Sequence, residues 1–511
     1  EERAASAALF VCSGSAKRRL HGAMARLRGW EMRKSIISQP QYREGEGSMT
    51  FTRRQVLGGL AGLAVVGLGA GGARLWLARP QVAQEYDYEL IAAPLDLEIV
   101  PGFSSPALAY GGQCPGVELR AKQGEWLRVR FTNRLDEPTT IHWHGIRLPI
   151  EMDGVPYISQ PPVQPGESFI YQFKTQDAGS YWYHPHLMSS EQLGRGLVGP
   201  LIIEEREPTG FRHEKVLCLK TWHVDEQGAF TPFSVPRQAA REGTRGRYST
   251  INGKHVPTID LPAGQIVRVR LLNVDNTVTY RLNLPNGEAR IYAIDGHPVE
   301  PRGFEGQYWI GPGMRLELAL KVPEAGTELS LRDGPVRLAT IRSVASAEAP
   351  AGDWPKPLPA NPVSEPDLAN AEKIGFRFEW VGAMSDTSGK NPYPSFWQIN
   401  GKAWEGGEEH KHNAPPLAKL KEGQSYIFEL RNMAQYQHPI HLHGMAFKVL
   451  DSDRRDIIPY FTDTYLLGKN ETARVALVAD NPGLWMFHCH VIDHMETGLM
   501  GTIAVGEAWC G

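Results

Sequence analysis

One short pattern occurs three times in this chain of 511 residues, and it restricts the fold more than any other feature. A glycine, an alternating apolar and polar stretch and an asparagine nine positions later occupy residues 124–133, 264–273 and 423–432. Such alternation between turn residues predicts a half-buried β-strand. A chain that repeats one strand-rich unit is predicted to form three β-sandwich domains with Greek-key connections.

The segments between the repeats set the expected domain limits. Residues 345–367, rich in proline, alanine and glutamate, predict a linker, and the charged, proline-containing turn at residues 204–208 predicts an earlier boundary. Helical periodicity is weak, and the 53 glycines and 38 prolines fit a turn-rich β protein. We therefore expect an all-β chain with domains at residues 84–206, 207–365 and 366–511, which follow a leader at residues 1–83.

The leader resembles an export signal. Arg53 and Arg54 precede an apolar, glycine-rich and alanine-rich run from Val56 to Ala73, as in twin-arginine signals. Met49 stands where such a signal would start, so residues 1–48 are interpreted as an upstream extension. The run is marginal as a membrane-spanning helix, and an uncleaved anchor is the alternative. We expect a periplasmic or otherwise exported protein without further stable membrane insertion.

The charge distribution argues against a nucleic-acid partner. Residues 1–83 carry 13 Lys+Arg and 5 Asp+Glu, a net charge of +8, which leaves −11 for the rest of a chain whose total is −3. Phosphate binding requires a basic surface, which an acidic body does not offer.

The five cysteines are too few for a disulfide framework in a chain of this length. Cys114 and Cys510 either pair or remain free thiols, and Cys218 is expected in the core. Cys489 differs because it lies between two histidines.

Ten of the 17 histidines fall into four clusters, two after the first repeat and two after the third. His142 and His441 each lie nine residues after the asparagine of their repeat, where the second repeat has Leu282. Histidines two residues apart on a strand project to one face, so the first and third domains can enclose metal ions between them. The clusters are His142 and His144; His184 and His186; His438, His441 and His443; and His488, His490 and His494.

The ligand chemistry favours copper. Imidazoles with one thiolate and no carboxylate suit copper better than calcium or magnesium, and structural zinc sites are smaller and usually contain more cysteine. Cys489 and His494, five residues apart, form with His438 the two-histidine, one-cysteine set of a blue-copper site. Because Cys489 is bonded to His488 and His490, an electron that reaches this copper has a covalent path to the other histidines.

The motifs HWHG, HPH, HPIHLHG and HCHVIDH resemble the copper-binding motifs of the multicopper oxidases, and the resemblance covers nearly all of residues 85–507. It implies three cupredoxin-like domains, a small-molecule or metal-ion reductant, O2 as the acceptor, and four copper ions: one type 1, one type 2 and a type 3 pair. Carried over by position, type 1 takes His438, Cys489 and His494, type 2 takes His142 and His441, and type 3 takes His144, His184, His186, His443, His488 and His490.

The resemblance also implies an acidic residue that delivers protons beside the O2 site. Asp153, eleven residues after His142, resembles it, whereas the simpler interpretation is a turn aspartate before Gly154. Bacterial relatives have a carboxylate directly after the last histidine, and this chain has Met495 there. Whether Glu496 or Asp493 substitutes is open.

The axial position of the type 1 site departs from the copper-efflux relatives, which have a methionine ten residues after the cysteine. Here that residue is Leu499, and Met500 follows it. Neighbouring side chains on a strand face opposite ways, so we expect no thioether ligand and a raised copper potential. A slip of one residue that restores Met500 is the alternative.

The substrate is the least constrained property. The 12 methionines are scattered, and His410 and His412 are interpreted as part of a solvated loop, so no segment gathers metal ions. A copper nitrite reductase would normally have two such domains. We expect a monomeric, laccase-like oxidase of phenols or aromatic amines, and the alternative is a metallo-oxidase for Cu(I), Fe(II) or Mn(II).

Overall fold

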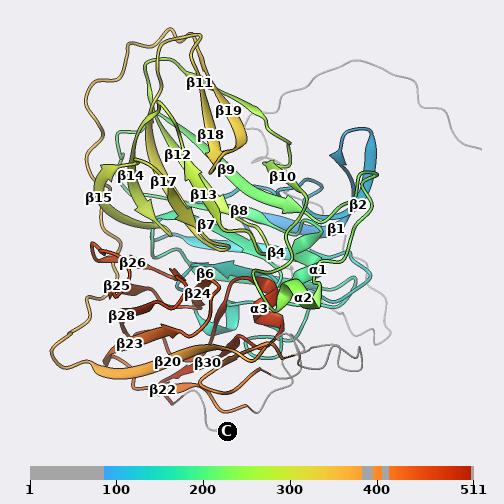
Figure 1. Cartoon of the computed structure of the whole chain (residues 1–511), viewed down its shortest axis with the longest axis vertical. Coiled ribbons are helices and arrows are strands. Elements are labelled where there is room, and N and C mark those ends of the chain that lie inside the picture. Colours follow the sequence, from blue (N-terminus) through green and yellow to red (C-terminus); the bar gives the residue numbers. More distant parts are fainter. Residues whose placement is uncertain (1–85, 383–394, 405–413, 508–511) are drawn as a thin grey trace, which may run out of the picture. The chain divides into compact units, whose positions relative to one another are not determined.

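The computed structural model of this chain describes residues 86–382, 395–404 and 414–507, all within one compact unit that spans Pro80–Gly511. Nearly half of the described residues form strands, which assemble into six sheets, and helices are few and short (Figure 1). The predicted all-β class is therefore confirmed. The predicted export signal at Arg53 and Arg54, and the predictions for Cys510, His410 and His412, lie outside the described residues.

The first two sheets contain the strands of residues 88–204. Their strand orders are β2-β1-β4-β6 and β3-β8-β7-β5. The 3-10 helix η1 (Ile150–Met152) and the helix α1 (Ser189–Gly194) lie in the connections. The strands are β1 (Tyr88–Val100), β2 (Phe103–Tyr110), β3 (Leu119–Lys122), β4 (Trp126–Asn133), β5 (His142–His144), β6 (Ser168–Lys174), β7 (Gly179–His184) and β8 (Gly199–Glu204).

The next two sheets contain the strands of residues 213–344. Their orders are β10-β9-β12-β17-β14-β15 and β11-β19-β18-β13-β16, and α2 (Pro236–Ala239) lies between β9 and β10. The strands are β9 (His213–Trp222), β10 (Tyr248–Ile251), β11 (Thr258–Pro262), β12 (Ile266–Asn273), β13 (Tyr280–Asn283), β14 (Glu288–Ile294), β15 (His297–Gly303), β16 (Tyr308–Ile310), β17 (Arg315–Lys321), β18 (Glu328–Asp333) and β19 (Val336–Val344).

The last two sheets contain the strands of residues 372–505. Their orders are β21-β20-β23-β28-β25-β26 and β22-β30-β29-β24-β27, and α3 (Ile492–Glu496) lies between β29 and β30. The strands are β20 (Glu372–Trp380), β21 (Trp397–Ile399), β22 (Ala418–Leu420), β23 (Ser425–Asn432), β24 (His438–Leu442), β25 (Phe447–Ser452), β26 (Tyr460–Thr462), β27 (Thr464–Leu467), β28 (Thr472–Val478), β29 (Gly483–Cys489) and β30 (Met500–Val505).

The three repeated segments form β4, β12 and β23, which take the same place in their sheets. Each pairs in parallel with the first long strand of its pair of sheets (β1, β9 or β20) and antiparallel with β6, β17 or β28. Three pairs of sheets fit the expected three domains. The boundaries after residues 206 and 365 stay a prediction.

The asparagine that ends each repeated strand holds the following turn. The side-chain amide of Asn133 donates to the carbonyls of Glu137 and Val163, and its oxygen accepts from the backbone of Leu135. Asn273 and Asn432 make equivalent bonds. A buried amide must satisfy its donors and acceptor, so this residue fixes the path of the chain into the next strand. That strand carries the histidines in the first and third pairs of sheets.

Two large apolar clusters show how the pairs of sheets pack. One cluster runs from Leu90 to Val505 and combines buried side chains of the first and third pairs. The other lies almost entirely within the second pair. A continuous core places the histidine-bearing strands of the first and third pairs against each other.

Cys218 is buried, as predicted. Cys218 and Cys114 are free thiols, and the Sγ of Cys114 lies 3.2 Å from the carbonyl of Gly196. Among the described residues, no helix has the length and apolar character needed to cross a bilayer.

Candidate metal centre

Four strand segments bring the predicted histidines together. β5 pairs with β7 so that His142 faces His184, and β24 pairs with β29 so that His441 faces His488. Eight imidazoles meet in one buried volume, each at most 2% exposed. They are those of His142, His144, His184, His186, His441, His443, His488 and His490.

Rings from the two pairs of sheets interleave. His142 stacks on His443 and His144 stacks on His441, each with ring centroids 3.9 Å apart. The Nε2 atoms of His443 and His488 are 3.0 Å apart. Three sets of ring nitrogens lie within 4.8 Å of one another: those of His142, His441 and His443; of His142, His144 and His184; and of His186, His443 and His488.

Several ring nitrogens point inward without a hydrogen-bond partner among the described residues. They include the Nε2 atoms of His142, His184 and His441. The Nδ1–H of each ring donates to a backbone carbonyl, that of Asp153, Pro185 and Asp463 respectively, at 2.8–2.9 Å. Each Nε2 then carries a lone pair, and a buried polar atom without a partner is costly. A metal ion provides the missing partner, so these residues fit a metal site.

Burial keeps these rings neutral. The pKa values of His144, His184 and His443 lie well below their usual range, because burial penalises the imidazolium form and the neighbouring imidazoles would repel it. The pKa of His490 is lowered in the same way. Neutral imidazole is the form that binds metals, so a cation would not have to displace protons here at neutral pH.

A second, smaller set consists of His438, Cys489 and His494, all fully buried. The two Nδ1 atoms are 3.1 Å apart, and the Sγ of Cys489 lies 3.6 and 3.5 Å from them. Two imidazole nitrogens and one sulfur at the corners of a small triangle are what a trigonal copper site requires. We refer to these three residues as the type 1 triad.

The tautomer of His494 is set from outside the third pair of sheets. Its Nε2–H donates to the carbonyl of Arg241 at 2.8 Å, which leaves the Nδ1 lone pair toward Cys489. Burial lowers the pKa of His494 to about 3 and raises the pKa of the Cys489 thiol. Trp397 packs against both imidazoles, with ring centroids 4.9 and 4.4 Å from those of His438 and His494.

Leu499 and Met500 lie in different apolar clusters. Leu499 is fully buried in the same apolar cluster as Cys489, and it accepts a backbone hydrogen bond from Cys489 at 3.0 Å. Met500 packs in another cluster, with Met486 and Met495. The axial assignment itself stays a prediction.

Asp153 lies within the histidine cluster, 1% exposed, at the end of η1. Its backbone carbonyl accepts from His142, and its Oδ2 is 2.9 Å from the Nδ1 of His443. Asp153 therefore contacts one histidine of the first pair of sheets and one histidine of the third pair.

Asp463, which the sequence did not single out, also contacts one histidine of the first pair of sheets and one of the third. Its backbone carbonyl accepts from the Nδ1 of His441 at 2.9 Å, and its Oδ1 is 3.2 Å from the Nε2 of His144. Asp463 follows β26, 22 residues after His441, whereas Asp153 lies eleven residues after His142. The spacing between histidine and aspartate therefore differs between the first and third pairs of sheets, and it could not identify Asp463. The only local signal was an aspartate between two threonines, Thr462 and Thr464.

Arg315, from the second pair of sheets, binds Asp463 with both ends of its guanidinium group, at 2.9 and 2.6 Å. It is fully buried and lies 3.5 Å from Asp295. Burial would raise the pKa of Asp463, but Arg315 and the two imidazole N–H groups lower it well below its usual range. Burial raises the pKa of Asp295 to about 7, because Arg315 compensates that carboxyl less.

Glu496 and Asp493 point to different places. Glu496 accepts from the backbone N–H of Ser190 at 2.9 Å and from its hydroxyl, so it links α3 to α1 just beyond His186. Asp493 accepts from the backbone N–H of Thr244 in the second pair of sheets. Burial raises the pKa of Glu496 to about 7 and raises that of Asp493.

Known proteins resemble this chain over most of its described length. Two family models described as multicopper oxidase match residues 96–208 and 386–508. A crystal structure of a multicopper oxidase from Pseudomonas Thermotolerans is 68% identical, with 83% of this chain and 100% of that chain covered and a TM-score of 0.78. Multicopper oxidase MmcO of Mycobacterium tuberculosis is 27% identical, with 83% of this chain and 87% of its own length covered. Laccase-1 of Botryotinia fuckeliana is 26% identical, with 78% of each chain covered.

The chain belongs to the multicopper oxidase family. It is a copper-dependent oxidoreductase that takes electrons from a reductant and passes them to O2.

Proposed function

We propose that the chain binds four copper ions and acts as a laccase-like oxidase of phenols and aromatic amines. The type 1 ion takes His438, Cys489 and His494, and the type 2 ion takes His142 and His441. The type 3 pair takes His144, His184, His186, His443, His488 and His490. Copper supplies the one-electron oxidation at the first site and the reduction of O2 to water at the other.

One observation carries this assignment. The type 1 triad and the cluster of eight imidazoles are separate donor sets, and Cys489 is bonded directly to His488 and His490 of the cluster. A purely structural metal site has no use for such a connection. Copper analysis and the visible spectrum test it: the wild type should bind four ions and show a strong blue band, and Cys489→Ser should lose the band and one ion.

The chain's own residues prepare both sites. Asp153 and Asp463 each receive the N–H of one imidazole at a backbone carbonyl and approach a second with a carboxylate. These bonds orient the rings and keep their other nitrogens free for metal. We also propose that Asp153 passes protons to the O2 site, and that Glu496, which contacts α1 beyond His186, serves there rather than Asp493.

A phenolic reductant is the main proposal because the scattered methionines form no segment that would gather metal ions, and Laccase-1 of Botryotinia fuckeliana is among the relatives. The second candidate is a metal-ion reductant. Steady-state O2 uptake by the copper-loaded protein decides between them, with 2,6-dimethoxyphenol compared against Cu(I), Fe(II) and Mn(II). Rapid uptake with the phenol alone supports the laccase-like function, and uptake confined to metal ions contradicts it.

We further propose that residues 1–83 direct export through a twin-arginine signal, and that the three pairs of sheets are copies of one repeated unit. Replacement of Arg53 and Arg54 by lysine should leave the protein in the cytoplasm. Export of the doubly substituted protein would contradict the signal.

A further inference from the structure

A cavity of about 560 Å³ lies between the second and third pairs of sheets. The second pair contributes Gly243 and Thr279 to its wall, and the third contributes Gln437 and Val491. Its volume falls within the range that binds a small organic molecule.

This cavity lies directly beside the type 1 triad. Gln437 precedes His438, and the backbone N–H of Val491 lies 3.4 Å from the Sγ of Cys489. Glu242, which also lines the cavity, follows Arg241, whose carbonyl accepts from His494. Gln437 is thus adjacent in sequence to His438, Val491 contacts Cys489, and Glu242 is one residue from the carbonyl that binds His494.

The triad itself has no exposed surface, since His438, Cys489 and His494 are each 0% exposed. A reductant must bind outside this shell and transfer its electron across it. The cavity provides a place to bind whose wall includes Gln437, next to His438, and Val491, which contacts Cys489.

Cationic side chains dominate the cavity wall. Arg245, Arg281 and Lys469 line it together with one carboxylate, that of Glu242, which lies 3.9 Å from Lys469. Asp333 lies 3.5 Å from Arg245 and 3.9 Å from Arg281. Three positive groups against these two carboxylates leave a net positive charge.

An aromatic surface adjoins these cations. Trp309 is 42% exposed, and the guanidinium group of Arg281 lies 5.8 Å from the centre of its ring. A flat ring can pack on the indole while an anionic substituent reaches Arg245 or Lys469. The wall thus offers matching surfaces for both parts of an anionic aromatic molecule.

We propose that this cavity binds the reductant and favours phenols that carry a carboxylate or sulfonate. The proposal rests on the proposed laccase-like function and specifies its substrate class. Each phenol gives one electron to the enzyme and its hydroxyl proton to water, and becomes a phenoxyl radical. Four such oxidations supply the four electrons that, with four protons, convert one O2 to two water molecules.

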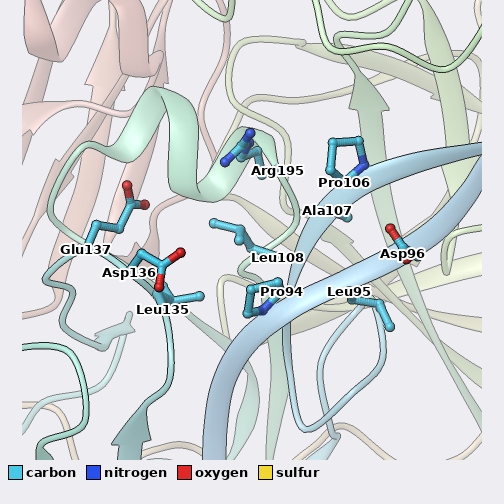
Figure 2. Close-up of a pocket in the computed structure, with 10 residues that line it drawn as sticks. All are labelled: Pro94, Leu95, Asp96, Pro106, Ala107, Leu108, Leu135, Asp136, Glu137 and Arg195. Carbon is cyan, nitrogen blue, oxygen red and sulfur yellow. The ribbon is translucent and has the colours of Figure 1, made fainter. Parts of the chain in front are cut away.

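A second cavity, of about 270 Å³, has the opposite character (Figure 2). The carboxylates of Asp96, Asp136 and Glu137 line it together with Arg195. This lining suits a cation, but it includes no residue adjacent to the type 1 triad. The charge beside the triad therefore disfavours metal cations as reductants.

The test compares syringate with methyl syringate, which has the same phenol but no negative charge at about pH 6. KM for each is measured by O2 uptake at low and high salt. We expect Arg245→Gln with Lys469→Gln to raise KM for syringate roughly 1.5- to 5-fold for each charge removed, the range for exposed ion pairs. The increase in KM for methyl syringate should be less than half as large. High salt should reduce the difference between the two substrates, because it screens the charges of the cavity wall.

Arg474→Gln is the matched control, since Arg474 is an exposed arginine paired with Asp451 on other strands. It should change neither KM. A separate measurement uses 3,5-dimethoxybenzoate, which lacks the oxidisable hydroxyl, and copper-free protein. Calorimetry should detect binding to the wild type and weaker binding both to the doubly substituted protein and to Thr279→Trp, whose larger side chain narrows the cavity.

The outcomes separate the two levels of the proposal. O2 uptake with neither phenol would overturn the laccase-like function. O2 uptake with both phenols, but equal changes in KM on removal of the two cations, would overturn the charge preference alone. Unchanged binding of 3,5-dimethoxybenzoate to Thr279→Trp would show that the ligand binds elsewhere.

Discussion

At the scale of single residues, Leu499 is the first side chain to test in the proposed type 1 site, because an axial ligand tunes the potential of such a copper ion. It is buried in the cluster of Cys489 and offers no thioether. Leu499→Met should lower the potential of the blue copper, because a weak axial donor stabilises the oxidised ion. Each tenfold preference for the oxidised ion lowers the potential by about 59 mV, which a redox titration of the blue band measures.

Met500→Leu is the control for this substitution. Met500 packs with Met486 and Met495 in a different cluster, so its removal should leave the potential unchanged. A large shift in Met500→Leu, with none in Leu499→Met, would mean that the strand is slipped by one residue and that Met500 is the axial group.

Asp295 should make stability depend on pH. The folded protein keeps a proton on this carboxyl up to about pH 7, whereas the unfolded chain releases it near pH 4. The stabilisation is thus complete below about pH 4 and is lost as the pH rises through 7. The side-chain amide introduced by Asp295→Asn would stay uncharged, and asparagine readily adopts the observed φ of 49°.

We therefore expect the free energy of unfolding of the wild type to fall relative to Asp295→Asn between about pH 4 and pH 7. At about 1.4 kcal/mol for each unit of pKa shift, the difference amounts to a few kcal/mol. Urea denaturation at both pH values measures it. A constant difference between the two proteins would show that Asp295 is ionised when folded.

At the scale of elements, the turn before β17 closes the wall of the imidazole cluster. Gly313 has a φ of 86°, and a Cβ there would lie 2.9 Å from ring atoms of His144 and His490. Gly313→Ala should displace these rings, so copper content should fall toward the single type 1 ion while the blue band persists. Copper analysis and absorbance at the blue band measure both.

Gly326→Ala is a matched control. Its φ of 88° imposes the same backbone strain, but a Cβ there meets nothing within 4 Å. Equal loss of copper in both variants would mean that strain, rather than contact with the histidines, is responsible.

Strand patterns in the sequence predicted much of the fold. The alternation in residues 124–133, 264–273 and 423–432 identified β4, β12 and β23, because side-chain direction on a strand follows position alone. The same periodicity predicted that His142 and His144 share a face. Short elements without such a pattern, such as α1 and α3, were not anticipated.

Contacts that cross between pairs of sheets could not be predicted. The bonds from Arg241 to His494 and from Arg315 to Asp463 join residues more than a hundred positions apart. A carbonyl acceptor such as that of Arg241 has no residue signature at all. Such contacts depend on how the pairs of sheets pack, which a single sequence does not display.

At the scale of the whole molecule, Arg315 ties the second pair of sheets to the metal centre. Arg315→Met would leave Asp463 buried without its cation. We expect a loss of about 3–5 kcal/mol in the free energy of unfolding, which urea denaturation of the copper-free protein measures. Arg342→Met, which removes a similar but exposed pair with Asp260, should change stability little.

An equal, small loss in both variants would show that Arg315 contributes no more than a surface charge. A large loss in Arg315→Met together with altered copper content would extend its role to the orientation of His144 and His441.

The imidazoles of the cluster come from strands near both ends of the described chain. During synthesis, β5 and β7 emerge from the ribosome long before β24 and β29. Copper can therefore complete this centre only after the last strands have folded onto the first. A complete set of bound copper ions is therefore expected only in chains whose β5, β7, β24 and β29 have been made and packed together.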